Sequence, residues 1–392
     1  MSEQSNTNYI VKTLHGLEQI LAGELEALGA TNVVPARRAV SFDGDQKMLY
    51  RANLELRTAL RILKPIKQFT ARNEQQLYDG IYAIDWSQYM DLQSTFAIDG
   101  VVRSQFFNHS KYVALKSKDA IADQFREKEG KRPNVNPVTP DLRINVFIYE
   151  HTVHVALDSS GDSLHKRNHG RETLEAPINE VLAAGMIRLA GWECDRPFLD
   201  PMCGSATIPI EAAMLAYNIP SQVHRTDFGF MKWPDYNAEL WETVRKEALD
   251  RVREFDFPIM GYDNNFQAVR IAERNVALAG LDDKVQIKRQ RFERISEPIP
   301  AGTIIMNPPY DERLAVDDIY DFYGMIGDQF KQQFGGHEAW IISSNMDAIK
   351  SIGLRASKKI TLFNGPLECK FLKFELYAGS KKAKYQNKDA TS

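Results

Sequence analysis

Cysteine and metal-binding histidine patterns are scarce in this sequence. Its 392 residues include three cysteines, Cys194, Cys203 and Cys369, which lie far apart and form no CxxC pair. That spacing argues against a disulfide scaffold or a cysteine-rich zinc site and fits a reducing cytoplasm. The eight histidines form no HExxH arrangement, so we expect no protein-bound metal.

Long apolar runs are also missing. No stretch approaches the roughly 18 to 20 apolar residues that a membrane-spanning helix requires. The polar start, MSEQSNTNYI, lacks the apolar run of a secretory signal. We therefore expect a cytoplasmic protein with no membrane partner. The length exceeds that of one ordinary domain and predicts two or three.

The formal net charge of −3 says little about whether the protein binds nucleic acid, so only local clusters of charge are informative. Between Arg103 and Arg143, nine Lys and Arg residues face five Asp and Glu residues, a local net of +4. Residues 166–171 form a second basic cluster, and lysines recur in the tail. Such clusters suit phosphate binding. A solvated charged surface explains each of them equally well.

The first half of the chain alternates between short strand and helix patterns. Apolar residues recur at helical spacing from Leu17 to Leu28, and Gly29 follows where a C-terminal cap would end the helix. The alternation predicts a small α+β module. Further expected elements are strands at 9–13, 39–42, 95–102, 142–150 and 152–157, and helices from 46 and at 112–128.

The second half has the pattern of a doubly wound α/β fold. Pro177 suits the first turn of a helix that runs to Ala190. Apolar strands then alternate with helices, as in a mainly parallel sheet. The expected strands are 197–199, 259–262, 285–287, 303–306, 340–343 and 370–377, with helices at 207–217 and 266–279.

Two of these strands end in an acidic residue. Residues 198–200 lead into a loop whose Gly204 and Ser205 would let the backbone approach a ligand closely. The loop matches neither GxGxxG nor a P-loop, and a structural turn is as good an explanation of it alone. Asp263, after strand 259–262, has the position of a ribose-binding acid. It also suits the N-cap of the following helix.

A third strand end, Ile304–Tyr310, carries the most specific motif, Asn-Pro-Pro-Tyr. The two prolines contribute no N–H donors and fix their own φ angles. The Asn307 side-chain carbonyl and the Pro308 backbone carbonyl then form a rigid pair of acceptors, which suits the two hydrogens of an exocyclic amino group. Tyr310 offers a ring on which a base can stack. The alternative is a proline-rich turn that closes the strand.

With Asp-Pro-Met-Cys-Gly-Ser at 200–205 upstream, this motif resembles the class I methyltransferases that act on amino nitrogens. Residues 110–121, 132–135 and 140–144 resemble the THUMP RNA-binding domain, and residues 164–167 and 175–177 resemble the entry into that family's catalytic domain. The similarity covers nearly the whole chain and is strongest to the RlmL-type 23S rRNA guanine-N2 methyltransferases.

The resemblance implies an α/β protein with several domains. These are a ferredoxin-like segment (1–65), a THUMP domain (66–158), a junction (159–180), a Rossmann-like seven-stranded methyltransferase domain (181–380) and a basic tail that we expect to be flexible (381–392).

Site residues also follow from the resemblance. Asp200 and Gly204 would line the methionine part of S-adenosylmethionine, and Asp263 would hold its ribose. The cofactor set is Asp200, Cys203, Gly204, Ser205, Asp263, Asn264 and Phe292; the catalytic set is Asn307, Pro308, Pro309 and Tyr310; the RNA-binding set is Lys111, Lys116, Lys118, Arg132, Lys166 and Arg167.

Two positions depart from the family pattern. Ala206 stands where relatives usually have a second glycine, so we expect the turn to avoid a glycine-like conformation there. In the run Lys288–Phe292, Gln290 or Arg291 replaces the acid that relatives often use near the adenine amino group. Phe292 remains available to pack on adenine.

A long linker, residues 217–252, adds Phe228, Phe230, Trp233, Tyr236 and Trp241 among cations. Such a segment can form an RNA-binding surface. Packing of a helical insertion against the sheet is the favoured interpretation.

The expected reaction is methyl transfer to N2 of a guanine in RNA, either 23S rRNA or a large-subunit assembly intermediate. The alternatives are a tRNA guanine, an adenine N6 in DNA, or a non-catalytic RNA-binding assembly factor. The oligomeric state is not predicted.

Overall fold

The computed structural model describes residues 6–167, 170–172, 178–295, 300–309 and 316–377. Within them the chain forms two compact units. Unit 1 combines the N-terminal part with a later insertion (up to 13, 21–166 and 225–250), and unit 2 takes 14–20, 167–224 and the residues from 251 onward. Within the described ranges, no helix has the length and apolar character to cross a membrane.

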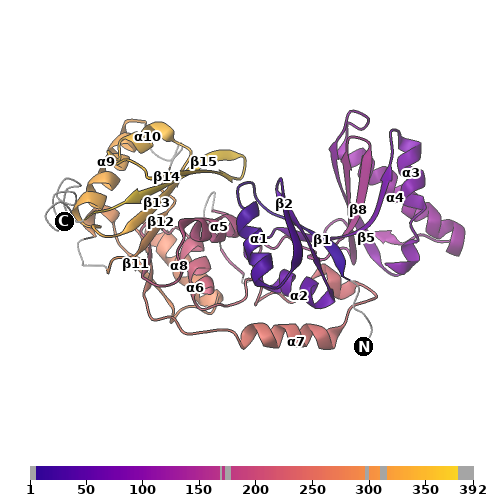
Figure 1. Cartoon of the computed structure of the whole chain (residues 1–392), viewed down its shortest axis with the longest axis horizontal. Coiled ribbons are helices and arrows are strands. Elements are labelled where there is room, and N and C mark those ends of the chain that lie inside the picture. The colour runs from indigo at the N-terminus through magenta and orange to yellow at the C-terminus, as the bar shows by residue number, and fades with distance from the viewer. Residues whose placement is uncertain (1–5, 168–169, 173–177, 296–299, 310–315, 378–392) are drawn as a thin grey trace, which may run out of the picture. The chain divides into compact units, whose positions relative to one another are not determined.

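Unit 1 is built on one eight-stranded sheet of order β2-β3-β1-β4-β8-β7-β5-β6. Its strands are β1 (Thr7–Lys12), β2 (Thr31–Ala36), β3 (Ala39–Gly44), β4 (Arg61–Thr70), β5 (Thr95–Arg103), β6 (Asn134–Val135), β7 (Leu142–Tyr149) and β8 (Thr152–Asp158). The helices are α1 (Glu18–Ala27), α2 (Gln46–Glu55), α3 (Glu74–Tyr82), η1 (Trp86–Gln88), α4 (Ser110–Glu129), η2 (Gly229–Lys232) and α7 (Ala238–Leu249). Figure 1 shows α3 and α4 side by side next to β5.

The hairpin expected at β7 and β8 is confirmed. The two strands are antiparallel, and Tyr149 pairs with Thr152 across the turn. Alternate residues of β7 are buried, as expected of a strand with one face on a core. The boundary that we predicted at residues 65/66 falls inside β4, which pairs with both β1 and β8. Strand pairing is therefore continuous across the two predicted N-terminal domains.

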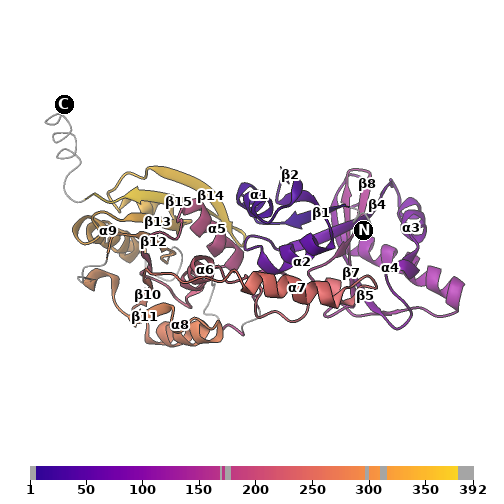
Figure 2. The ribbon, with the colours of Figure 1, turned by 60° about the horizontal axis from the view of Figure 1, so that its bottom comes forward.

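The aromatic insertion belongs to unit 1. Phe228, Phe230 and Trp241 are buried in its core, and the Phe230 ring stacks on Tyr50 of α2 at 4.4 Å between centroids. Figure 2 shows α7 beside α2. Because these rings are buried, they do not form the RNA-binding surface that we considered for residues 217–252. The packing interpretation holds, and the sheet involved is that of unit 1.

Unit 2 contains a seven-stranded sheet of order β11-β10-β9-β12-β13-β15-β14. Its strands are β9 (Phe198–Asp200), β10 (Ile259–Asp263), β11 (Val285–Arg289), β12 (Thr303–Met306), β13 (Glu338–Ser343), β14 (Lys358–Asn364) and β15 (Leu367–Glu375). The helices are α5 (Glu180–Ala190), α6 (Thr207–Ala216), α8 (Phe266–Leu278), η3 (Phe292–Arg294), α9 (Val316–Gln332) and α10 (Met346–Lys350). The predicted helix start at Pro177 lies outside the described residues; α5 begins at Glu180 and is capped by Asn179.

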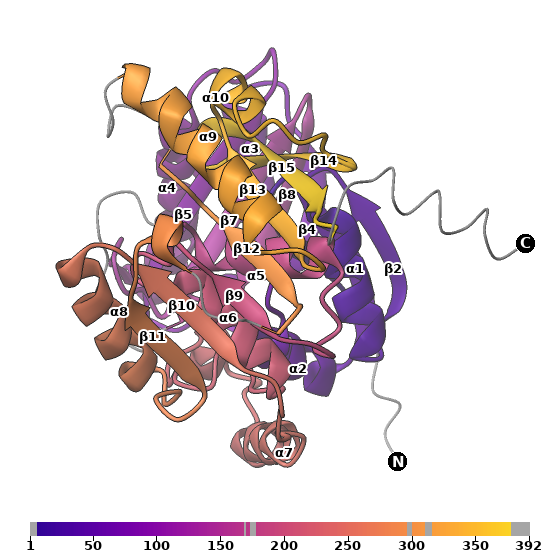
Figure 3. The same cartoon turned by 90° about the vertical axis from the view of Figure 1, so that its left-hand side faces the viewer.

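The predicted Rossmann-like α/β architecture is confirmed. Strands β11, β10, β9, β12 and β13 are parallel neighbours, and β15 joins antiparallel (Figure 3). The chain runs from β9 to β10 on one side of the sheet, and β12 later pairs with β9 on the other. This reversal of strand order opens a crevice at the carboxyl end of β9. The three motifs that end β9, β10 and β12 therefore meet there.

Candidate cofactor and substrate site

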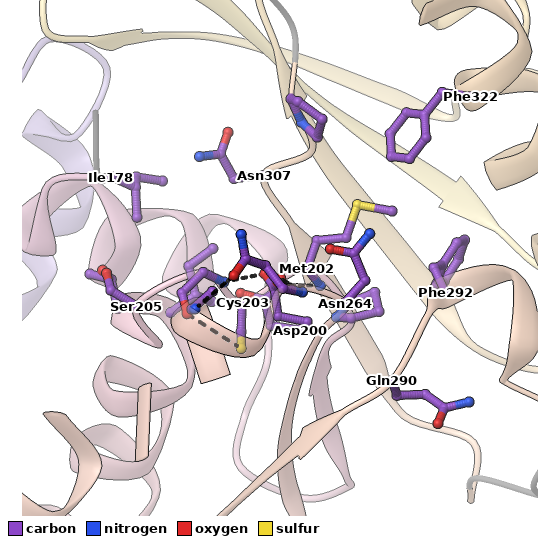
Figure 4. Close-up of a pocket in the computed structure, with 18 of the residues that line it drawn as sticks. Ile178, Asp200, Met202, Cys203, Ser205, Asn264, Gln290, Phe292, Asn307 and Phe322 are labelled. Atoms are coloured by element: carbon purple, nitrogen blue, oxygen red, sulfur yellow. Dashed lines mark hydrogen bonds between the residues drawn. The ribbon is translucent and has the colours of Figure 1, made fainter. Parts of the chain in front are cut away.

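A cavity of about 460 Å³ lies at the carboxyl ends of β9, β10 and β12. Its volume falls within the usual range for small-molecule sites, roughly 300 to 1,000 Å³. In Figure 4, Asp200 and Cys203 lie low in the centre, Asn307 lies above them, and Phe292 and Phe322 lie to the right. The lining residues are Ile178, Asp200, Pro201, Met202, Cys203, Gly204, Ser205, Thr207, Ile208, Asp263, Asn264, Asn265, Ala268, Gln290, Phe292, Glu293, Asn307, Pro309 and Phe322.

The loop after β9 is held by hydrogen bonds to the end of its own strand and to β10. The N–H of Met202 donates to the Asp200 carboxylate at 3.1 Å, and the N–H of Cys203 donates to the Tyr262 carbonyl at 2.8 Å. Gly204 has a positive φ of 54°, which glycine adopts without cost.

The expectation for Ala206 is wrong. It has φ 65° and ψ 26°, a left-handed conformation, immediately before α6. The sharp entry into α6 requires this backbone even without a glycine. A non-glycine residue in this region costs roughly 1 to 3 kcal/mol, which the surrounding structure must offset. The Ala206 side chain is fully buried, so packing contributes to that offset.

Asp263 ties the two strand ends together. One carboxylate oxygen accepts from the N–H of Gly204 at 3.0 Å, and the other accepts from the N–H of Asn265 at 2.9 Å. The N-cap of α8 is Asn265, whose side chain accepts from Gln267 and Ala268, so the capping interpretation of Asp263 is wrong. An ionised carboxylate retains further acceptor sites for a ribose hydroxyl.

Two buried groups at the base of the cavity resist ionisation. Burial raises the pKa of the Asp200 carboxyl well above its usual value; the Met202 N–H opposes this rise, and the Asp263 charge adds to it. Burial also raises the pKa of the Cys203 thiol, and the charges of Asp200 and Asp263 add to that effect. This direction favours the protonated thiol, which is a weaker nucleophile than the thiolate.

A glycine in β10 permits the close packing under the loop. A Cβ at Gly261 would lie 2.7 Å from Ile287 Cδ1 and 3.2 Å from Cys203 Sγ. Sequence reasoning did not single out this glycine, although a glycine inside an apolar strand is a recognised sign of close backbone approach.

The motif after β12 places an unpaired acceptor at the cavity. Asn307 lines it, and the Asn307 Oδ1 atom is buried with no hydrogen-bond partner among the described residues. Pro309 also lines the cavity, whereas Pro308 is buried and does not. Tyr310 lies outside the described residues. An unsatisfied buried acceptor is costly, roughly 1 to 3 kcal/mol, and marks a place for a ligand donor.

A hydrogen-bond chain supports this motif from behind. The Tyr323 hydroxyl donates to the Pro309 carbonyl at 3.3 Å and lies 3.0 Å from Ser343 Oγ, which accepts from the N–H of Asn345. Tyr323 and Ser343 are fully buried. No sequence signal pointed to them, because they lie on α9 and at the end of β13.

Phe292 lines the cavity and also belongs to the apolar core, where its ring is stacked on Phe334 at 5.6 Å. Gln290 lines the cavity as well, and its side-chain amide donates to the Arg294 carbonyl. Sequence reasoning missed Ile178 and Phe322, since neither belongs to a strand-end motif.

The basic residues expected to bind RNA differ in exposure. Lys111, Arg132 and Lys166 are exposed, and Lys166 lies 3.4 Å from Asp162. Lys116 lies over the Tyr78 ring and Lys118 pairs with Asp119.

Arg167 lacks the exposure that we expected of an RNA-binding residue. Its side chain is 0 % exposed and its Nε lies 2.9 Å from Glu211 Oε1, with a second contact from Nη2 to Oε2. A guanidinium buried in a bidentate ion pair inside unit 2 does not contact RNA.

The cavity fits S-adenosylmethionine. A buried carboxyl at Asp200 matches a cationic amino group, Asp263 matches a ribose, and Phe292 matches an aromatic base. The unpaired Asn307 oxygen remains for a substrate donor.

Comparison with known proteins assigns the chain to a family. Family models match the RlmL ferredoxin-like domain over residues 8–63, the THUMP domain over residues 71–158 and the RMKL-like methyltransferase domain over residues 167–373. The "Ribosomal RNA large subunit methyltransferase K/L" of Syntrophotalea carbinolica is 39% identical over 375 residues, which cover 92% of this chain and 52% of that protein. This chain thus spans about half the length of that relative.

Two further relatives match over nearly their whole length. A Synechocystis sp. protein with the name "Putative RNA methyltransferase slr0064" is 37% identical and covers 94% of this chain and 97% of its own. The crystal structure of SMU.472 complexed with SAH superposes with a TM-score of 0.85 at 29% identity, over 96% of this chain and 99% of that one. The chain therefore belongs to the family of RMKL-like, S-adenosylmethionine-dependent methyltransferases that carry an RlmL ferredoxin-like domain and a THUMP domain.

Proposed function

We propose that this chain methylates the exocyclic N2 of a guanine in 23S rRNA. The observation that carries this proposal is the buried, unpaired Oδ1 of Asn307 at the rim of a cavity that fits the cofactor. A guanine amino group has two hydrogens that need acceptors. RNA as the substrate class is supported by the names of the two curated relatives and by the THUMP family match. The choice of guanine N2 is supported by the whole-chain resemblance.

The protein's part in the reaction is positioning. When bound, S-adenosylmethionine supplies an activated methyl group on a sulfonium. Asp200, Gly204 and Asp263 would hold the cofactor, and Asn307 would accept a hydrogen bond from the amino group and so aim its nitrogen. The hydrogen bond from the Tyr323 hydroxyl to the Pro309 carbonyl would keep the Asn307 acceptor in place. Such an arrangement lowers the barrier by orientation and by favouring the charge that develops on the nitrogen.

The exposed basic residues of unit 1 deliver the RNA in this proposal. Lys111 and Arg132 are exposed and belong to the predicted THUMP range of residues 66–158. They would contact phosphates and backbone shape rather than sequence. Because the chemistry acts on a base edge, a paired guanine would have to be flipped out of its helix.

The test is methyl transfer from labelled S-adenosylmethionine to three substrates: 23S rRNA from cells that lack the protein, tRNA and duplex DNA. We expect labelling of 23S rRNA, with mass mapping that places the methyl group on guanine N2. The Asn307→Ala variant should lose about 100-fold or more in kcat. Asn307→Asp, which keeps an acceptor oxygen, is the matched control and should retain more activity. Exclusive labelling of tRNA or DNA would refute the proposed substrate, and full activity of Asn307→Ala would refute the role of the acceptor.

A further inference from the structure

An exposed aromatic residue outside the three motifs directly follows two residues that line the cofactor cavity. Phe266, the first residue of α8, is 56% exposed. It directly follows Asn264 and Asn265, both of which line the cavity. A large apolar ring with this exposure contributes little to the core, so core packing does not account for a phenylalanine at this position.

Two arginines flank the ring. The guanidinium carbons of Arg270 and Arg289 each lie 5.9 Å from the centroid of Phe266, at the outer limit of a cation–π contact. They come from different elements, since Arg270 is on α8 and Arg289 ends β11. Both side chains are exposed.

These two guanidinium groups keep most of their donors available. Arg289 Nε donates to the Asn264 carbonyl at 3.2 Å, which fixes this side chain next to the cavity rim. Among the residues that the structure describes, neither Arg270 nor Arg289 forms an ion pair with a carboxylate. An arginine carries five N–H donors in a planar fork, so the remaining donors suit phosphate oxygens.

The chain segment that contains Arg289 is basic. The run from Lys288 to Arg294 contains four cations and one acid, Glu293, which lies 3.7 Å from Arg291. This is the run in which cations and an amide replace the acid expected near adenine. Such a surface repels cationic partners and attracts polyanions.

We propose that Phe266, Arg270 and Arg289 form a binding platform for one unpaired nucleotide of the RNA substrate. This inference rests on the proposed RNA methyltransferase function and adds a contact site in unit 2. A base stacks on the ring or on a guanidinium plane, and the arginines hold the adjacent phosphates. In this proposal the platform holds RNA beside the loop that carries Asn264 and Asn265, two residues that line the cavity.

The experiment compares Phe266→Ala and Arg270→Gln with matched controls in the full chain. The controls are Phe257→Ala, an aromatic residue that is 41% exposed, and Arg188→Gln, an exposed arginine on α5. The probe is a labelled oligouridylate, and affinity for S-adenosylmethionine and kcat on saturating 23S rRNA are measured in parallel.

Phe266→Ala should weaken oligouridylate binding about 5-fold to 150-fold, while kcat and cofactor affinity stay unchanged. Arg270→Gln should lower the slope of log affinity against log salt by about 0.7, the value for one single-strand phosphate contact. The controls should behave as the unsubstituted protein does.

Oligouridylate binding by Phe266→Ala that equals binding by Phe257→Ala would overturn the platform, as would an unchanged salt slope in Arg270→Gln. If the unsubstituted protein methylates 23S rRNA while these variants are normal, only the platform is wrong. If the unsubstituted protein methylates no RNA, the proposed function fails and the platform fails with it.

Discussion

The Asp200→Asn substitution is expected to stabilise the folded protein while weakening its affinity for S-adenosylmethionine. Asp200 is 2% exposed, and its pKa in the folded protein is raised by burial and by Asp263. In the unfolded chain an aspartate has a pKa of about 3.9. Below that pH the carboxyl is protonated in both states and contributes no penalty.

As the pH rises above about 4, Asp200 ionises in the unfolded chain before it ionises in the folded protein. This ionisation favours the unfolded state, so the Asp200 carboxyl lowers the free energy of unfolding. This loss grows until the pH passes the raised pKa of the folded state. Asparagine does not ionise, and its amide oxygen can still accept from the Met202 N–H that now donates at 3.1 Å. The variant should therefore have the larger free energy of unfolding at neutral pH, with the difference vanishing near pH 4.

Cofactor binding should change in the opposite direction. A cationic amino group bound beside Asp200 favours the ionised form of its carboxyl. The resulting charged hydrogen bond is worth about 1.5 to 3 kcal/mol. Its loss corresponds to an increase of about 10-fold to 150-fold in Kd. Urea unfolding between about pH 4 and pH 8 measures the first effect and calorimetric titration the second. Asp282→Asn, at an exposed aspartate of unit 2, is the control. A variant that is less stable at neutral pH, or that binds the cofactor as tightly as the unsubstituted protein, would refute the reasoning.

Three more substitutions test the framework around the site. Glu211→Ala leaves its arginine partner buried without a counter-charge and should cost about 3 to 5 kcal/mol in urea unfolding; a loss below about 1 kcal/mol would contradict the buried pair. Tyr323→Phe removes the donor to the Pro309 carbonyl, so kcat should fall about 2-fold to 10-fold while cofactor Kd by calorimetry is unchanged; an unaltered kcat would exclude a positioning role. Gly261→Ala places a Cβ 2.7 Å from Ile287 Cδ1 and should cost about 1 to 3 kcal/mol in thermal unfolding. Adding Ile287→Val should restore part of that loss, and no restoration would point to another clash.

Local patterns predicted the elements whose side chains alternate clearly. The hairpin of β7 and β8 could be placed because buried and exposed residues alternate along β7. Strand β2, by contrast, is exposed along nearly its whole length, so it carries no such alternation and was not predicted. A strand can be recognised from sequence when one of its faces is buried, because apolar and polar residues then alternate along it.

The residues of the candidate site likewise include some that could be found from sequence and others that could not. The strand-end acids and Asn307 could be found from sequence because each directly follows an apolar strand, and parallel strands bring their ends together. Tyr323 and Phe322 could not be found this way, since their roles depend on where α9 packs. Glycine-like backbone at Ala206 was also missed, because residue type alone argues against it.

By itself, the sequence determined the α/β class, the order of those elements that have a clear side-chain period, and the three motifs that meet at the cavity, because spacing along the chain encodes periodicity and strand ends. Tertiary structure alone decided which of two neighbouring cations is exposed: Lys166 lies at the surface, whereas Arg167 is buried against Glu211. It also decided that residues 225–250 join the core of unit 1. Both outcomes depend on partners more than 40 positions away, and no local pattern carries information about such partners.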